Sequence, residues 1–371
     1  MHPYRQFLIF LTAYSAVYLM SIFWINVWAD PFGLRTYGGR IGHSRLVKAI
    51  LINRINPKKV FVGASSVAIG LNPEHEAFKN YEPVYNLGIY GANFYELKRY
   101  FQHAASGENL EKALIGLDFY GFNQFSKIKS GFSETRLQSR RMKPQDFLRL
   151  YLSLEALTLI RDSNEAANYF SPNGKIIELK NFDAKNREEL FAKHLRQNFS
   201  DEEGVYRRYS LSTEAIKDFI ELVSTAQQNN IDIQIFLPPS HATLFYPSRM
   251  TTYWTVYQRW LRAVVEIHPV WDFSGCNSIT TTPINFSEKS YEDPLHFTPQ
   301  LGNWIIERVY TSEVDSLPSD FGVYVTSENV DSHLQRVRQQ CKLWLQENPE
   351  VVEWLEGLDL RQQLVLSVQN M

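Results

Sequence analysis

Three short segments of the chain contain side chains that can perform nucleophilic chemistry together. Asp293 and His296 stand three residues apart, a spacing that lets the carboxylate bind one imidazole nitrogen and fix the tautomer of the ring. The other ring nitrogen is then available to take the proton of a serine hydroxyl. Ser65 is the candidate serine, because it directly follows a predicted strand in the sequence Gly-Ala-Ser-Ser. Ser66 is the alternative if the register shifts by one residue.

The third segment covers residues 86–91, where two glycines let the backbone approach a ligand closely. Taken singly, each segment also has an ordinary interpretation: a connecting turn, a tight loop between a strand and a helix, and a solvated Asp/His pair. A phosphate-binding loop after the first strand is disfavoured, because the pattern GxxxxGK[ST] is absent there.

A regular alternation of strand-like and helix-like stretches supplies the elements that must position these segments. Strands are predicted over 59–63, 83–87, 113–119, 231–237 and 269–273, and helices over 44–55, 93–105, 213–228, 251–267 and 299–310. This alternation predicts an α/β fold with a central parallel sheet and helices on both faces. Because parallel strands end at one edge of a sheet, the three segments are expected to converge there.

The N-terminal region reads as a membrane anchor. No charged residue occurs between Arg5 and Asp30, and roughly 20 apolar residues suffice for a helix to cross a bilayer. A transmembrane helix within residues 1–30 is therefore predicted, rather than a buried core helix. The basic residues just after the span argue against placing the following domain outside the cytoplasm, because positive charge favours the cytoplasmic side. These residues are Arg35, Arg40, Arg45 and Lys48.

The remaining regions interrupt or extend the alternation. We predict an α/β domain over 43–312, a helical cap inserted at about 121–210, and a helical C-terminal extension over 313–371. With 38 Lys+Arg against 40 Asp+Glu there is no basic field, so nucleic acid is not an expected partner. Cys276 and Cys341 lack the spacing of a thiolate metal site, although one disulfide between them is possible. No metal or cofactor is predicted, because only the Asp-x-x-His pair has anything like ligand spacing.

The order of these segments resembles the SGNH (GDSL-like) hydrolase superfamily over residues 59–310. The resemblance implies a flavodoxin-like three-layer sandwich, with Ser65 as nucleophile, His296 as base and Asp293 as the residue that orients it. It also implies an oxyanion hole made by the backbone N–H groups of Ser65 and Gly91. One block departs from the family pattern, because the chain has Gly-Leu-Asp-Phe at 116–119 where the family has Gly-x-Asn-Asp.

This departure leaves three possibilities open. Asn123 reaches the oxyanion hole from further along the chain, Asp118 takes another part, or the third donor is missing. One such donor contributes about 10²–10³ in rate, so its identity bears directly on activity.

A single span followed by these blocks is similar to a narrower group of envelope proteins. In that group, a single-span SGNH protein works beside a membrane-bound O-acyltransferase, as in lipoteichoic acid D-alanylation and alginate acetylation. The resemblance implies a serine esterase or O-acyltransferase at the inner (cytoplasmic) membrane. Its active site would lie outside the cytoplasm and act on an ester-bearing glycan or lipid. The alternative is a catalytically inactive binding or assembly partner in a polysaccharide export or modification complex.

Several other residues are candidates for substrate binding. Candidates at the loop ends are Ser66, Asn93, Asp118 and His241, although a histidine packed in its loop is an equal interpretation of His241. A basic cluster in the cap could hold an anionic glycan, although a solvated helix face is the more ordinary interpretation; it consists of Arg136, Arg140, Arg141 and Lys143. Aromatic residues that could stack on a sugar, or fill the core, are Tyr90, Phe94 and Tyr95.

Overall fold

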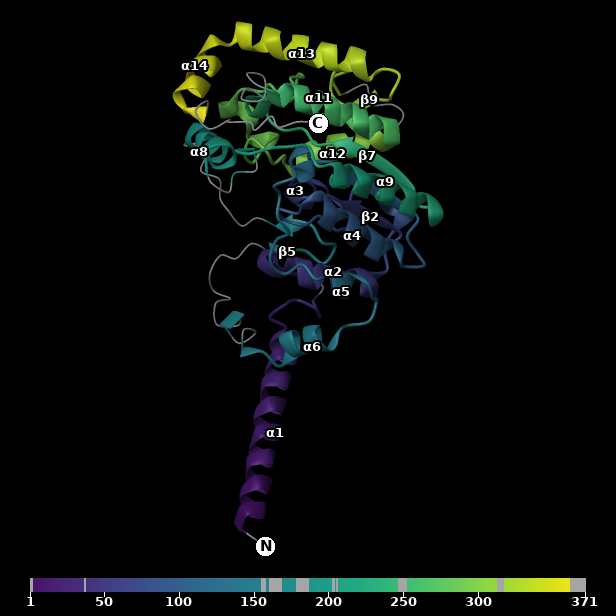
Figure 1. The fold of residues 1–371 in the computed structure, drawn as a ribbon, viewed down its shortest axis with the longest axis vertical. Coiled ribbons are helices and arrows are strands. Elements are labelled where there is room, and N and C mark those ends of the chain that lie inside the picture. Colours follow the sequence, from purple (N-terminus) through teal and green to yellow (C-terminus); the bar gives the residue numbers. More distant parts are fainter. Residues whose placement is uncertain are drawn as a thin grey trace.

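A mixed six-stranded sheet forms the centre of the molecule in the computed structural model (Figure 1). The structure describes residues 3–36, 38–154, 158–159, 169–177, 187–201, 204, 206–245, 252–311 and 317–360, without the side chains of 252 and 287–289. The strand order is β3-β2-β4-β7-β8-β9, and only the β8–β9 pair is antiparallel. The strands are β2 (Lys59–Val62), β3 (Val84–Asn86), β4 (Lys112–Gly116), β7 (Asp232–Leu237), β8 (Val270–Asp272) and β9 (Val323–Val325). The predicted α/β fold with a mostly parallel sheet is confirmed.

Alternating residues of each strand enter two separate hydrophobic cores, one on each face of the sheet. Val60 and Val62 lie in one core, whereas Phe61 lies in the other, as the two-residue period of a strand requires. The first core is shared with α2 (Ser44–Ile55), α4 (Phe94–Ala105), α9 (Thr213–Gln228) and α11 (Thr252–Ile267). The second is shared with α3 (Ser65–Gly70) and α12 (Pro299–Tyr310). Both faces of the sheet are therefore covered by helices.

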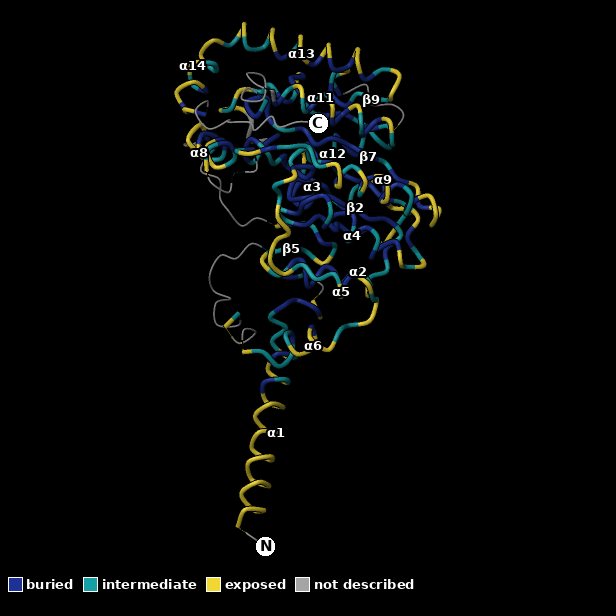
Figure 2. Tube along the Cα trace, viewed as in Figure 1, coloured by how far each residue is buried: buried dark blue, intermediate teal, exposed yellow. Residues whose placement is uncertain are grey.

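Helix α1 (Pro3–Ala29) stands away from the rest of the molecule and is exposed along most of its length (Figures 1 and 2). It is long and apolar enough to cross a membrane, and its most apolar stretch is only 6% buried, unlike the core helix of a soluble protein. Its last turns contact α6 (Pro144–Tyr151), where the Asn26 amide donates to the Tyr151 carbonyl at 3.0 Å.

The inserted region contains strands as well as helices. Besides α5 (Glu134–Leu137), α6 and α8 (Arg187–Phe199), it forms a hairpin of β5 (Tyr169–Phe170) and β6 (Ile176–Ile177). Strand β1 (Gly39–Arg40), which follows α1 in the chain, pairs with β5. The helical cap that the sequence predicts thus also contains strands, and segments of two residues leave no alternating pattern by which to detect them. The sequence of this region also favours a helix over 145–157; α6 ends at Tyr151, and residues 155–157 lie outside the described residues.

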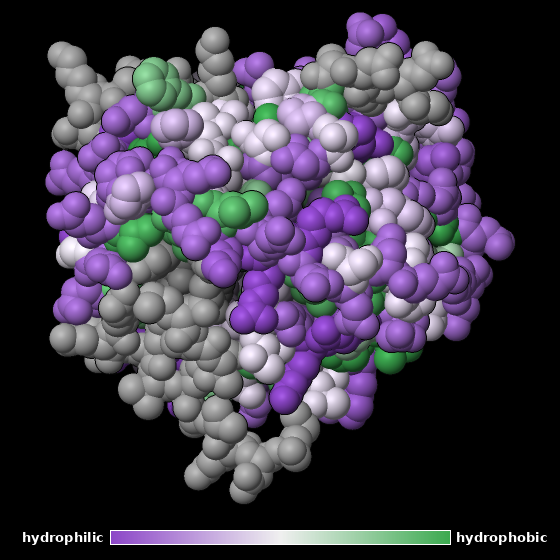
Figure 3. All heavy atoms as spheres, turned by 90° about the horizontal axis from the view of Figure 1, so that it is seen from above, coloured by the Kyte–Doolittle hydropathy of each residue, from purple (hydrophilic) through white to green (hydrophobic). Residues whose placement is uncertain are grey.

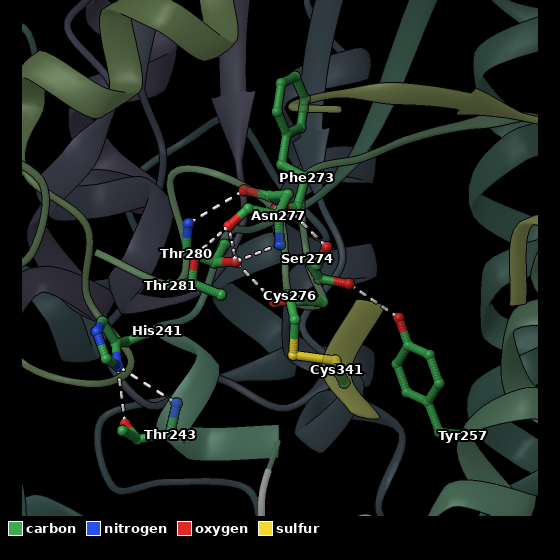
Figure 4. The surroundings of a disulfide bond; sticks show 11 residues. His241, Thr243, Tyr257, Phe273, Ser274, Cys276, Asn277, Thr280, Thr281 and Cys341 are labelled. Carbon is green, nitrogen blue, oxygen red and sulfur yellow. Dashed lines mark hydrogen bonds between the residues drawn. A yellow bond between two sulfur atoms is a disulfide. The ribbon is translucent and has the colours of Figure 1, made fainter. Parts of the chain in front are cut away.

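The C-terminal extension is joined to the sheet rather than separate from it. It supplies the edge strand β9 and the helices α13 (Val330–Glu347) and α14 (Pro349–Gly357). A disulfide links Cys276, in the loop after β8, to Cys341 of α13 (Figure 4). Beside it, the His333 ring binds the buried Asp272 carboxylate at 2.8 Å. The sequence left the disulfide only as a possibility, because a separation of 65 residues carries no pairing signal.

Candidate active site

Ser65, His296 and Asp293 form a continuous hydrogen-bonded chain at the carboxyl end of the sheet. Ser65 is the first residue of α3, three residues after β2 ends, and its Oγ lies 2.8 Å from Nε2 of His296. The Nδ1 atom of His296 lies 2.6 Å from Oδ2 of Asp293. The imidazole therefore faces Ser65 and not Ser66, which removes the alternative register.

The loop before α12 holds Asp293 as an ionised hydrogen-bond acceptor. Its Oδ1 accepts from the backbone N–H groups of Leu295 at 2.8 Å and His296 at 3.1 Å. Burial alone would raise the pKa of Asp293, but the His296 ring and these N–H groups hold it at about 2. His194 of α8 lies 3.6 Å from the same carboxylate, so the cap contributes a second imidazole that the sequence analysis missed.

The loop between β3 and α4 reaches the same site. The Tyr90 ring stacks on the His296 ring, with centroids 6.0 Å apart and an interplanar angle of 28°. The next residue, Gly91, has φ +61°, a left-handed conformation that favours glycine. Among the described residues, the backbone N–H groups of Ser65 and Gly91 have no hydrogen-bond acceptor. Both remain available to a ligand, as an oxyanion hole requires.

Asn86, at the end of β3, fixes this loop against the helix that carries Ser65. Its amide nitrogen donates to the carbonyls of Val67 at 2.9 Å and Leu71 at 3.0 Å. Its Oδ1 accepts from the N–H of Gly88 at 2.9 Å. A single buried side chain therefore sets the position of α3 and of the glycine loop relative to each other.

Lys48 of α2 is completely buried and binds the same loop. Its ammonium donates to the carbonyls of Asn86 at 3.0 Å, Gly88 at 2.8 Å and Gly174 at 2.7 Å. Burial lowers the pKa of Lys48 to about 7. The lysine joins the glycine loop to the β5–β6 hairpin, and the sequence analysis gave it no such role.

Asp118 lies directly after β4, where the resembling family has asparagine. Both of its carboxylate oxygens accept from the Ser66 hydroxyl, at 3.2 and 3.1 Å. Burial raises the pKa of Asp118 to about 6, although Ser66, the His296 ring and the Ala64 backbone each lower it. Ser66 is only 3% exposed, so its predicted contact with substrate is corrected: it binds Asp118 instead.

Tyr120 is a further residue of the site that the sequence analysis did not select. Its hydroxyl interacts with the Ser65 side chain, and burial, followed by the Asp118 charge, raises the pKa of Tyr120 well above its usual value. The phenol therefore stays protonated and is able to donate a hydrogen bond beside the nucleophile. No motif marks it, since it lies in a short 3-10 helix, η3 (Phe119–Phe122), whose position depends on the fold.

No protein-family model matches this chain, and no curated protein matches it in sequence.

Asn123 does not supply the missing oxyanion donor. Its amide nitrogen donates to the Arg208 carbonyl at 2.8 Å, and its Oδ1 accepts from the N–H groups of Phe125 and Ser210, both at 3.2 Å. The Asn123 side chain therefore links the backbone at residue 125 to the backbone at residues 208–210. The first of the three possibilities is therefore disfavoured, because an asparagine that satisfies buried backbone groups is not directed at a ligand.

Asn93 and His241 also have structural roles in place of the predicted substrate contact. Asn93 caps α4, accepting from the N–H of Glu96 in a capping box. His241 is 1% exposed, and one of its ring nitrogens lies 2.9 Å from Thr243 Oγ1 (Figure 4). The other ring nitrogen lies 2.8 Å from the Thr282 carbonyl. Burial lowers the pKa of His241 to about 4, so the ring stays neutral.

The basic cluster does not act as one surface. Arg136 is buried and pairs with Asp146 through two hydrogen bonds of 2.9 and 2.8 Å, while Arg140 binds the end of α2 at Asn56. Of the three aromatic candidates, Tyr90 stacks on the His296 ring of the candidate site. Phe94 is a core residue, and the Tyr95 hydroxyl donates to Glu134.

An aromatic cavity of about 60 Å³ adjoins Asp118 at the carboxyl ends of β4, β7 and β8. Its walls come from α11, from the loops after these strands and from the cap. They are Leu117, Asp118, Phe119, Phe199, Tyr206, Leu237, Pro238, Ser240, Leu244, Phe245, Tyr253, Tyr257, Trp260 and Ser274. The cavity is predominantly apolar, and a small organic group would fit it. Within the described part of the chain, no cluster of three or more His, Cys, Asp or Glu side chains is arranged to hold a metal ion.

Proposed function

We propose that the protein is a serine esterase or O-acyltransferase of the SGNH type that works through an acyl-serine intermediate. The observation that carries this proposal is the Ser65–His296–Asp293 chain, with contacts of 2.8 and 2.6 Å. A serine aligned on an imidazole that a buried carboxylate orients is the arrangement that activates a hydroxyl for attack.

In the first half-reaction, Ser65 Oγ attacks the carbonyl carbon of an ester and its proton passes to Nε2 of His296. Asp293 accepts the hydrogen bond of the Nδ1–H and stabilises the imidazolium. The N–H groups of Ser65 and Gly91 bind the oxyanion, and we assign the role of the family's asparagine to the neutral phenol of Tyr120, which interacts with the Ser65 side chain. The C–O bond then breaks, and the departing alcohol takes the proton from Nε2.

In the second half-reaction, water or a sugar hydroxyl attacks the acyl-serine. Its proton passes to Nε2 of His296, and the ester bond to Ser65 Oγ breaks. Ser65 then recovers that proton as it leaves. Water as acceptor makes the protein an esterase, and a sugar hydroxyl makes it a transferase.

The topology supports the SGNH assignment. Numbered along the chain, the five parallel strands have the order 2-1-3-4-5, which is the order of flavodoxin-like sheets. Ser65 follows the first of these strands, and the His296 loop precedes the last helix of the α/β core. This is the arrangement expected of a flavodoxin-like SGNH domain.

We further propose a single-pass protein of the inner membrane whose catalytic domain lies outside the cytoplasm. Helix α1 is the anchor, and the Cys276–Cys341 disulfide supports the placement, because disulfides persist in oxidising compartments. This argument outweighs the basic residues that follow the span. The substrate would be an ester-bearing glycan or lipid, and a membrane-bound O-acyltransferase is the partner implied by the resemblance.

The alternative, an inactive binding or assembly partner, is favoured by one observation. Asp118 stands where the family has asparagine, and its carboxylate cannot donate to an oxyanion when ionised. Labelling with a fluorophosphonate probe separates the two functions, because the probe forms a covalent adduct only with an activated serine.

The full chain in detergent micelles is expected to be labelled on Ser65, with the adduct located by peptide mass spectrometry. Labelling should disappear in Ser65→Ala and fall at least 100-fold in His296→Ala. The exposed Ser332→Ala on α13 serves as the matched control and should be labelled like the unmodified chain. An unlabelled chain, or an adduct that forms equally well without His296, would establish the inactive alternative.

A further inference from the structure

Helix α6 leaves two apolar side chains exposed beside the last turns of α1 (Figure 1). The rings of Phe147 and Tyr151 contact Phe23 of α1, with centroids 6.1 and 5.7 Å apart. Phe147 nevertheless stays 40% exposed, and the neighbouring Leu148 is 53% exposed. Scattered apolar residues are common on soluble proteins, but Phe147 and Leu148, here called the apolar pair, continue the exposed apolar surface of α1. The surface of the proposed anchor thus extends onto the domain.

The level of this surface follows from the sequence of α1. Asp30 is the first charged residue after the apolar stretch, and its carboxylate accepts from the backbone N–H groups of Leu34 and Arg35, both at 2.8 Å. Such a carboxylate belongs among the polar headgroups. Phe23 precedes Asp30 by seven residues, or about 10 Å along the helix axis. The apolar faces of interfacial helices enter a bilayer by about 5–10 Å, which is the depth of the rings that contact Phe23.

Three carbonyls at the C-terminal end of α6 and just after it are paired within the protein. The Asn26 amide of α1 donates to the carbonyls of Tyr151 at 3.0 Å and Ser153 at 3.4 Å. The Ser153 hydroxyl donates to the Arg149 carbonyl at 2.6 Å. Backbone groups at the edge of the hydrocarbon layer need such partners, because little water reaches them there. The end of α6 beside α1 therefore suits an environment poor in water.

Another face of α6 is fixed to the domain. Asp146 and Leu150 are four residues apart, so they share one side of the helix, and both are buried. Arg136 of α5 binds the Asp146 carboxylate at 2.9 and 2.8 Å. Leu150 belongs to the same hydrophobic core as Leu137 of α5. A helix held in this way keeps its apolar pair outside the domain.

Basic residues stand where the chain leaves α1 and where it enters α6. The exposed Arg35 donates to the Trp28 carbonyl at 2.8 Å, which places its guanidinium at the end of α1. Lys143 directly precedes α6. Cationic side chains at the level of the headgroups are attracted by lipid phosphates. Apolar residues flanked by basic ones match the chemistry of a phospholipid surface.

We propose that α6 is a second membrane contact, whose apolar pair enters the interfacial layer of the bilayer that α1 crosses. The inference rests on the proposed anchor and is independent of the proposed reaction. A single helix leaves a domain free to tilt, whereas a second contact attached to the core fixes its orientation. On this proposal the catalytic residues are held at a set height and angle above the lipid surface.

Spin labelling of the full chain in nanodiscs of phosphatidylethanolamine and phosphatidylglycerol tests the contact. The two native cysteines are joined in a disulfide, so a single introduced thiol takes the label. Labels are placed at Leu148→Cys, at Leu19→Cys on α1 and at Leu343→Cys on α13, where the native side chains are 53, 48 and 47% exposed. The measurement compares collisions of each label with oxygen, which concentrates in lipid, and with a polar nickel chelate, which stays in water.

The Leu148 label is expected to resemble the Leu19 label, with a ratio of oxygen to nickel collisions roughly five-fold above that of Leu343. A Leu148 ratio equal to that of Leu343, with Leu19 in the bilayer, overturns the second contact and leaves the anchor in place. A Leu19 label in water overturns both. Spin–spin broadening at Leu148 would show contact with a second copy of the chain and would also overturn the proposal.

A charge on the apolar pair gives an independent test. Leu148→Glu should speed amide hydrogen exchange in α6 about ten-fold in nanodiscs, because a carboxylate is expelled from the interfacial layer. Leu343→Glu makes the same change at a similarly exposed position and should leave exchange in α6 unchanged. Equal exchange in the two variants would contradict the proposal.

The outcome is separate from the test of catalysis. If fluorophosphonate fails to label Ser65 but the Leu148 label lies in lipid, the proposed reaction is wrong and the membrane contact stands. If Ser65 is labelled but the Leu148 label lies in water, the reaction stands and the membrane contact is wrong.

Discussion

The two carboxylates nearest the nucleophile have pKa values displaced in opposite directions. Asp293 accepts two backbone N–H groups and faces His296, which hold its pKa at about 2, whereas burial raises the pKa of Asp118 to about 6. Carboxylates whose environments push their pKa values apart have different roles in the same site. In the proposed mechanism Asp293 stays ionised to stabilise an imidazolium, whereas Asp118 changes charge near pH 6.

The raised pKa of Asp118 predicts a pH-dependent cost in stability. A folded-state pKa above the unfolded value contributes stability below about pH 4, which is lost as the pH rises through about 6. Ionised Asp118 therefore costs up to about 3 kcal/mol at pH 7.5. Asp118→Asn keeps an oxygen acceptor for Ser66, so it should raise the free energy of unfolding by up to that amount at pH 7.5 and hardly at all at pH 4.

Denaturant unfolding at the two pH values checks this prediction. Asp331→Asn is the control, because that carboxylate is 78% exposed in a surface pair with Arg262. An Asp118→Asn effect of the same size at pH 4 and pH 7.5 would contradict it.

Tyr120→Phe tests the proposed third oxyanion donor. Loss of one such donor is expected to lower kcat for p-nitrophenyl acetate by about 10²–10³ with little change in KM, because the hydrogen bond strengthens only in the transition state. Tyr324→Phe, on the exposed edge strand β9, should leave kcat unchanged. A decrease in kcat of less than three-fold in Tyr120→Phe would assign the phenol a packing role instead.

Whether a residue of the site could be predicted from the sequence depends on how far along the chain its partners lie. Asp293 and His296 are three residues apart, and each of the three loops follows a predicted strand, so this constellation could be proposed from the sequence. Tyr120, His194 and Lys48 could not be found in this way, because their contacts join segments that only the fold brings together. The choice among the three possibilities for Asn123 stayed open for the same reason, since its partners at 208 and 210 lie across the insertion.

At the scale of elements, the site depends on how two loops and a hairpin are held. Asn86 fixes the glycine loop to α3, and Lys48 fixes it to the β5–β6 hairpin. The helices and longer strands could be predicted from periodicity. The hairpin and β9 could not, because strands of two or three residues are too short to show a pattern.

Replacement of Lys48 should weaken both the fold and the reaction. In Lys48→Met, the carbonyls of Asn86, Gly88 and Gly174 lose a buried donor, and each unsatisfied group costs about 1–3 kcal/mol. We expect destabilisation of roughly 3 kcal/mol or more. We also expect slower fluorophosphonate labelling of the fraction that remains folded, because the Gly91 N–H is no longer held in place.

Thermal unfolding and the labelling rate measured below the melting transition check this prediction. Lys58→Met removes a lysine whose side chain is 38% exposed and should change neither quantity. Labelling at the unmodified rate in folded Lys48→Met would mean that the lysine stabilises the fold without positioning the loop. Because burial lowers the pKa of Lys48 to about 7, the folded chain carries the cost of a buried charged ammonium below that pH. This cost decreases as the pH rises above 7, so the free energy of unfolding should increase there.

At the scale of the whole molecule, the anchor and the disulfide lie at opposite ends. Helix α1 extends from the side that carries α6, whereas α13 and α14 cover the far end (Figure 1). The surface seen from that far end is mostly hydrophilic, with scattered apolar patches (Figure 3). Helix α13 and the Cys276–Cys341 bond therefore lie on the side of the molecule away from the proposed membrane, with the sheet between.

The disulfide is expected to hold the C-terminal extension on the sheet. Closing a loop of about 66 residues removes conformational freedom from the unfolded chain, which corresponds to about 4 kcal/mol in the chain-entropy model. Cys341→Ser should lower the free energy of unfolding by up to this amount and speed amide hydrogen exchange in α13. A reductant should reproduce both effects in the unmodified chain and have no effect on the variant, whereas Ser332→Ala on the same helix should retain the unmodified chain's response to reductant. If protein purified without reductant is alkylated at both cysteines, the bond does not form in the cell. The disulfide would then no longer support a catalytic domain outside the cytoplasm. The basic residues after α1, which favour the cytoplasmic side, would decide the orientation.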